Sequence, residues 1–179
     1  VHVFQRGIDI YDRASLGGVW RANCGHNNGR KMPMLLSGLA LDSDRILKYA
    51  DAEKHFIFQD DRQTFFVSEE DLNNSAHSTP YTEEDLGMPE WGCKYTIKNG
   101  KGANRDWSAS YRGIVGSGYV PHALAAYLTP GAVEVWNHPP FFAYVERYVR
   151  KGSPSGAGAN SIQPFHQAFW DEYRDVGAN

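Results

Sequence analysis

Apolar residues recur at helical spacing along most of this chain, and that periodicity restricts the fold more than any other feature. Intervals of three and four residues give one apolar face to each of five stretches: 3–16, 33–41, 43–50, 110–128 and 139–149. A sixth stretch, "QPFHQAFWDEYRDV" at 163–176, has an aromatic face. The sequence therefore predicts a mainly α-helical chain, and its 179 residues are most simply one domain.

Proline and capping residues mark where these helices begin. Pro33 suits the first turn of a helix, and Asp42 or Ser43 would cap the helix that follows. Pro121 would either kink the helix over 110–128 or mark its true start. Three glycines in the same stretch predict close packing by neighbouring elements: Gly113, Gly116 and Gly118.

The stretch 53–108 breaks the helical pattern. Two short β-like runs at 55–58 and 64–68 surround a polar turn, and a segment rich in Pro, Gly and Asn follows them. So long a connection with little helix is typical of a binding loop or lid, so we expect a long irregular insertion containing short β-strands. The stretch "GSPSGAGANS" at 152–161 predicts a flexible linker.

Composition limits the classes of partner. A net charge of −3 gives no basic footprint for nucleic acid, and no apolar run is long enough to span a membrane. We expect no metal and no cofactor, because HxxxH, HxH and phosphate-loop patterns are missing. Cys24 and Cys93 would pair if the chain is exported and would otherwise be two free thiols. The chain starts at Val1 without a signal peptide, so we expect a processed chain or a piece of a longer protein.

A polar, cationic loop runs directly into the helix that starts near Pro33. It offers His26, Asn27, Asn28, Arg30 and Lys31 at the helix N-terminus, where partial positive charge favours an anion such as a carboxylate. The alternative is a helix-entry loop that satisfies backbone groups, with its two cations in ion pairs.

Paired carboxylates form a second candidate site. Asp60 or Asp61, with Glu90, would serve a glycosidase as acid and base. Because neighbouring residues of a strand point to opposite faces, at most one of the two aspartates would face a cleft. A turn with Arg62 is the alternative.

Aromatic and histidine side chains give weaker signals. Trp91 and Trp107 flank the long insertion and would either stack on sugar rings or form a small satellite core. We interpret His122, within an apolar stretch, as a satisfied core histidine.

Six segments occur in an order that resembles a known group of proteins. They are "GHNNGRKMPMLLSGLAL", "DDRQTFFVSEED", "MPEWG", "YRGIVGSGYVPHALAAYL", "VWNHPPFFAYVERYV" and "FWDEYR". Together they are similar to the C-terminal half of a secreted bacterial family with an (α/α)-toroid fold, related to alginate-lyase-like and heparinase-like proteins and six-hairpin glycosidases. The resemblance implies an (α/α) toroid or an incomplete α/α barrel, completed by an N-terminal half or a second chain, and a secreted or periplasmic location.

The resemblance also implies a reaction. Many toroid lyases use Asn, His, Tyr and Arg, and this chain offers Asn27, His26, Tyr111 and Arg112. In β-elimination, donors such as Arg30 stabilise the charge that develops on a uronate, and a Tyr or His removes the proton next to the carboxylate. We therefore expect a polysaccharide lyase, in which the loop and Arg112 neutralise the carboxylate and Tyr111 is base or acid.

Two alternatives remain open at this stage. One is a glycoside hydrolase that uses Asp60 or Asp61 with Glu90. The other is a non-catalytic, carbohydrate-binding or structural half of a larger assembly. In each case we expect a polysaccharide or oligosaccharide ligand, with Asn28, Arg30, Lys31, Asp61, Trp91 and Trp107 as contact residues.

Overall fold

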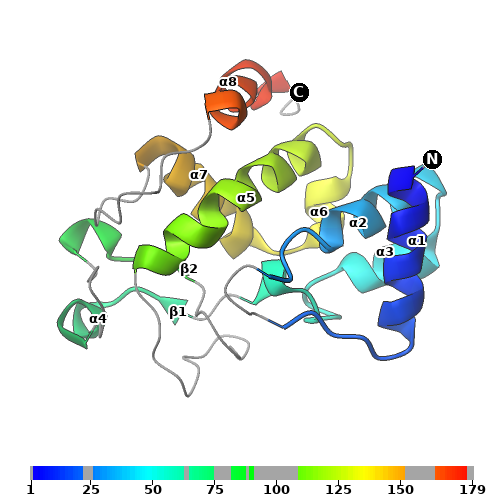
Figure 1. The fold of residues 1–179 in the computed structure, drawn as a ribbon, viewed down its shortest axis with the longest axis horizontal. Helices are drawn as coiled ribbons and strands as arrows, with labels where there is room; N and C mark the ends of the chain where they lie inside the picture. Colours follow the sequence, from blue (N-terminus) through cyan, green and yellow to red (C-terminus); the bar gives the residue numbers. More distant parts are fainter. Residues whose placement is uncertain are drawn as a thin grey trace.

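The computed structural model is built mainly from α-helices, which confirms the predicted class (Figure 1). It describes residues 2–21, 26–62, 65–74, 82–87, 89–90, 109–151 and 164–176. The α-helices are α1 (His2–Ser15), α2 (Lys31–Ala40), α3 (Asp44–Ala50), α4 (Glu69–Asn74), α5 (Ala109–Tyr127), α6 (Ala132–Trp136), α7 (Pro139–Lys151) and α8 (Pro164–Tyr173). Two 3₁₀ turns, η1 (Gln59–Asp61) and η2 (Glu83–Asp85), lie in the predicted insertion. The predicted linker at 152–161 lies outside the described residues.

The helices pack in two groups that meet through α6. Helices α1, α2 and α3 pack on one another at one end of the molecule, and α5 packs on α7 and α8 (Figure 1). Helix α6 contacts α2, α3 and α5. Its five residues are too few for a periodic apolar pattern, so this helix could not be predicted from the sequence.

Close approach of helices depends on glycines, as expected. A Cβ on Gly116 of α5 would lie 2.7–2.9 Å from the Tyr148 ring of α7, and one on Gly118 would lie 2.7 Å from the Asn28 amide. Pro121 neither starts nor ends α5, since the helix continues through it. Ser43 is the N-cap residue of α3, although its side chain makes no capping hydrogen bond.

In the described part of the predicted insertion, β-structure is shorter than expected. The prediction of a strand at 55–58 is wrong, because those residues form no β-ladder and lead directly into η1. The strand predicted at 64–68 is reduced to β1 (Phe65–Phe66), which pairs antiparallel with β2 (Pro89–Glu90). Helix α4 follows β1 in a region where we expected little helix.

Aromatic residues from both groups fill the centre of the structure. Trp136 stacks on Phe141 with ring centroids 4.4 Å apart, and Trp20 stacks on Phe58 at 5.0 Å. Tyr119 joins the same buried cluster from α5. Aromatic residues make up 13% of the sequence, and burial of these rings accounts for part of that content.

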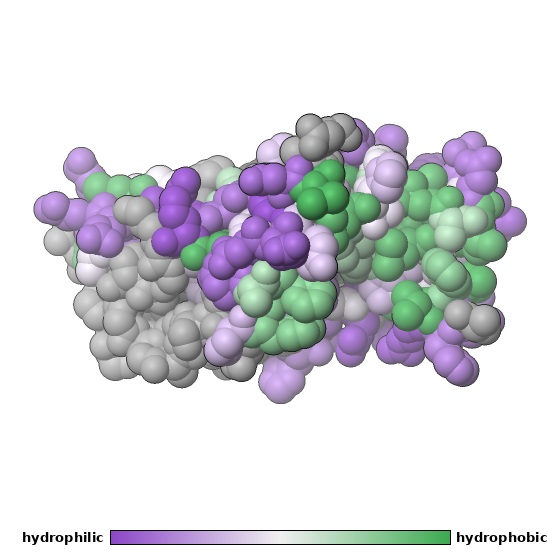
Figure 2. Space-filling model, turned by 90° about the horizontal axis from the view of Figure 1, so that it is seen from above, coloured by the Kyte–Doolittle hydropathy of each residue, from purple (hydrophilic) through white to green (hydrophobic). Residues whose placement is uncertain are grey.

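Some large apolar side chains remain on the surface. Seen from above, hydrophobic surface lies near the middle of the face, where α8 lies, and toward the end formed by α1–α3 (Figure 2). Phe165, Phe169 and Tyr173 of α8 are exposed, and so are Val3 and Phe4 of α1. The first and last helices therefore each keep an unburied apolar face.

Candidate functional site

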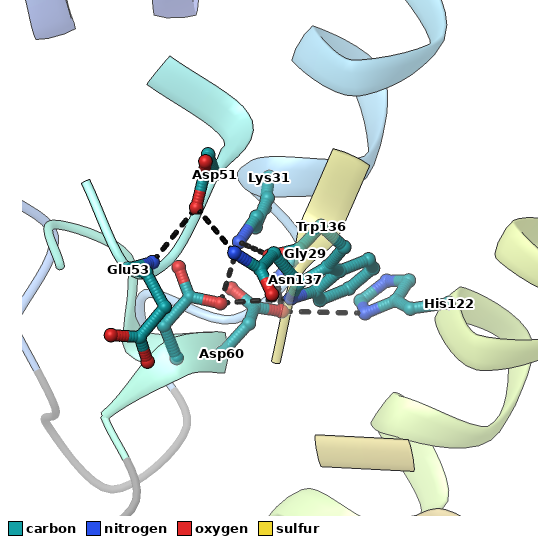
Figure 3. A network of polar contacts seen from close by, with 9 residues as sticks. Gly29, Lys31, Asp51, Glu53, Asp60, His122, Trp136 and Asn137 are labelled. Carbon is teal, nitrogen blue, oxygen red and sulfur yellow. Dashed lines mark hydrogen bonds and ion pairs between the residues drawn. The ribbon is translucent and has the colours of Figure 1, made fainter. Parts of the chain in front are cut away.

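A fully buried ion pair lies where α2, η1 and α6 meet. Lys31 Nζ lies 2.7 Å from Asp61 Oδ1, and neither side chain has any exposed surface. The same oxygen accepts a hydrogen bond from the Trp136 indole Nε1 at 2.8 Å (Figure 3). Lys31 Nζ also donates to the Trp136 carbonyl at 3.4 Å and lies 4.9 Å from the centre of its ring. These contacts fix the first turn of α2 against η1 and α6.

Burial dominates the electrostatics of this pair. It raises the pKa of Asp61 from 3.8 to about 6, although the charge and hydrogen bond of Lys31 oppose that rise. The neighbouring Asp60 carboxylate adds to it. Burial also lowers the pKa of Lys31, against the attraction of Asp61 and Asp60. The pair therefore holds two charges in a place where solvent does not help to stabilise them.

The second aspartate of η1 points to a different partner. Asp60 is almost fully buried, and its Oδ1 lies 3.7 Å from Nδ1 of His122 on α5 (Figure 3). The Gly29 backbone N–H donates to the same Oδ1 at 3.4 Å. The other oxygen, Oδ2, is buried without a hydrogen-bond partner. Adjacent residues of one 3₁₀ turn thus connect to α2 and to α5.

The predicted donor loop lies directly on α5. A Cβ on Gly29, whose φ is +76°, would lie 3.1 Å from the His122 ring, while the Asn28 amide packs on Gly118. From the other side, Gln59 Oε1 accepts a hydrogen bond from the Asn27 backbone N–H at 3.1 Å. The loop is therefore held between η1 and α5.

The predicted site residues separate into three groups. His26 is exposed, and Asn27, Asn28 and Arg30 are half-buried on the loop. Lys31 and Asp61 are buried in the ion pair. For Lys31 this agrees with the alternative interpretation of the loop, in which its cations form ion pairs. The backbone of Tyr111 and Arg112 lies in α5, but their side chains are outside the described part of the structure. Trp91 and Trp107 lie outside the described residues, and so do Cys24 and Cys93.

Sequence reasoning was wrong about His122. Its side chain is 24% exposed, and it contacts the loop backbone and a buried carboxylate instead of filling the core. The sequence does hold a signal for this contact: His122 follows Gly118 by four residues, so both lie on one face of the helix, and a glycine marks where another segment packs closely.

Other cavities carry less chemistry. A hollow of about 420 Å³ lies between α3 and α6, lined by charged side chains that include Asp44, Lys48 and Glu134. We do not favour this hollow as a ligand site on its size alone, because, in the described part of the chain, the buried polar side-chain atoms that lack a hydrogen bond belong to residues outside its lining. Within the described ranges, no three His, Cys, Asp or Glu residues lie close enough to hold a metal ion. Among the described helices, none has the length and hydropathy that crossing a bilayer requires.

Comparisons with protein-family models, with curated proteins and with solved structures found no match to this chain.

The buried pair predicts a large stability effect. Replacing Lys31 with Met leaves the Asp61 carboxylate buried without its counter-charge, so we expect the free energy of unfolding to fall by about 3–5 kcal/mol. The matched control is Lys54→Met, which removes the Lys54–Asp51 pair, where the lysine is 63% exposed, and should cost at most about 1 kcal/mol. Urea unfolding of both variants measures the difference, and equal losses would contradict a dominant role for the buried pair.

The raised pKa of Asp61 predicts a pH dependence. Between the unfolded value near 3.8 and the folded value of about 6, the folded protein keeps a proton on Asp61 that the unfolded chain has lost. This group's contribution to stability is therefore complete below about pH 4 and is lost as pH rises to about 6, by an amount on the order of 3 kcal/mol. Unfolding of wild type and Asp61→Asn across this range isolates the effect, and parallel stability curves would contradict it.

Proposed function

We propose that this protein cleaves a uronate-containing polysaccharide by β-elimination, with the 26–30 loop as its carboxylate-binding element. The observation that supports this most is the contact between that loop and α5. Asn28 and Gly29 of the donor loop pack on Gly118 and His122 of α5, the helix that also carries Tyr111 and Arg112 nearer its N-terminus. A site assembled from loop and helix can present several groups to one sugar.

The charge of the loop suits an anionic substrate. His26 is exposed, and the Arg30 guanidinium, half-buried, donates to the Asn28 carbonyl at 3.4 Å, which leaves other N–H groups of its fork for a ligand. Lys31 is not available for this purpose, because its ammonium is buried against Asp61. In the proposed reaction, Arg30 and His26 bind the uronate carboxylate and stabilise the negative charge that develops when the adjacent proton is removed.

A toroid is the architecture that we propose for the complete protein. Two helical groups packed on a common centre, with apolar faces left exposed on α1 and α8, are compatible with part of a larger ring of helices. Phe165 is 64% exposed, and a further helix or a second chain would bury such a face. With the family that the sequence resembles, we also propose export from the cytoplasm.

Hydrolysis by paired carboxylates has less support. Asp61 is committed to Lys31, Asp60 is almost fully buried, and the side chain of Glu90 lies outside the described residues. The exposed aromatic face of α8 instead favours, as the second candidate, a non-catalytic half that works in an assembly.

An absorbance assay tests the lyase proposal. Each β-elimination creates a C=C bond conjugated to the carboxylate, so we expect ultraviolet absorbance to rise when the protein meets one of a panel of uronate polysaccharides, with a neutral polysaccharide as blank. Arg30→Ala should raise KM about tenfold or more, because a charge-assisted hydrogen bond is lost. Arg6→Ala, an exposed arginine on α1, should leave the rate unchanged. Folded protein that produces no absorbance with any polymer would contradict the proposal.

A further inference from the structure

The imidazole of His122 lies against the loop that we propose binds the substrate carboxylate. A Cβ on Gly29 would lie 3.1 Å from Cε1 of the ring and 3.2 Å from Nε2. Only glycine leaves room for the ring at this distance, and its φ of +76° also favours glycine. His122 is therefore a direct neighbour of the Asn28–Arg30 segment.

The two nitrogens of this ring have different surroundings. Nδ1 is buried, makes no hydrogen bond and faces the Asp60 carboxylate at 3.7 Å. The side chain is 24% exposed, and Nε2 is the ring nitrogen that lies next to Gly29, 3.2 Å from the place where a Cβ on that residue would be. A carboxylate behind Nδ1 favours the tautomer with its proton on Nδ1, which leaves a lone pair on Nε2. The 3.7 Å gap is longer than a hydrogen bond, as is common before a substrate closes a site.

The backbone position of Tyr111 also favours His122 as the group beside the loop. It precedes His122 by eleven residues in α5, so the two backbone positions lie about three turns, or about 16 Å, apart along the helix axis. At this point of α5 it is His122, and not Tyr111, that lies next to the loop.

We infer that His122 is the base of the proposed elimination and that Asp60 is its positioning residue, an assignment that rests on the proposed lyase function. Nε2 takes the proton from the carbon next to the carboxylate, and that C–H electron pair forms the C=C bond. The bond from the neighbouring carbon to the glycosidic oxygen breaks, and its electron pair leaves with the oxygen. The imidazolium then returns the proton to this oxygen, so that His122 ends neutral.

Kinetics of three variants test the assignment. We expect His122→Gln to lower kcat by at least about 100-fold, the usual contribution of a general base. Asp60→Asn should lower kcat by a smaller factor, at least about tenfold, with KM unchanged, because an amide no longer fixes the tautomer. His55→Gln, which replaces a half-buried histidine that stacks on Tyr49, is the matched control and should keep the wild-type rate. Active protein in which His122→Gln keeps the wild-type rate would overturn this inference alone, whereas inactive wild type would overturn the proposed function and this assignment with it.

The tautomer of His122 gives a readout that needs no turnover. In ¹⁵N-edited spectra of the wild-type protein with a neutral His122 ring, we expect the proton on Nδ1. In Asp60→Asn we expect a mixture of the two tautomers, with the ring of His55 unchanged. A wild-type ring with its proton on Nε2, or one that is indifferent to Asp60→Asn, would overturn the positioning role of Asp60.

Discussion

The ion pair between Lys31 and Asp61 fixes two segments that are 30 residues apart in the chain, and the site depends on both. Burial makes the pair costly unless each charge is well partnered, and here the Trp136 indole and carbonyl supply the additional contacts. Two isolated charges would not remain in this position, so the start of α2, the turn η1 and the end of α6 must come together. The buried pair thus fixes the relative positions of α2, η1 and α6, although burying the two charges costs some stability.

The buried pair also determines where Asp60 and the donor loop lie. Because Asp60 precedes Asp61 in one 3₁₀ turn, fixing Asp61 on Lys31 directs Asp60 toward α5 and His122. In the same way, fixing Lys31 at the start of α2 sets the loop before it, and Gly29 and Asn28 then pack on α5. Adjacent residues therefore have different partners: Lys31 and Asp61 form the buried pair, while Arg30 and Asp60, with His122, belong to the site that we propose.

Much of the helical fold could be predicted from the sequence, because an amphipathic face is a repeated, local signal. The starts of α1, α3, α5 and α8 were expected close to where they lie, and Gly116 and Gly118 were expected to mark close packing. The contacts that form the site are not local. The spacing of Lys31 and Asp61 in the sequence does not reveal their pairing. A polar turn was expected where Asp60 and Asp61 form a 3₁₀ turn, but the sequence does not show which partner each aspartate faces. His122 was misinterpreted because its neighbours in sequence are apolar, while its neighbours in space are Gly29 and Asp60.

The proposed site requires the donor loop to lie on α5 beside His122. The most direct measurement is a nuclear Overhauser effect between the α protons of Gly29 and the Hε1 proton of the His122 ring in the folded wild-type protein. We expect a strong cross-peak, because Cε1 lies 3.1 Å from the place where a Cβ on Gly29 would be. A well-folded protein without this cross-peak would contradict the claim, since the loop and the imidazole could not then form one site.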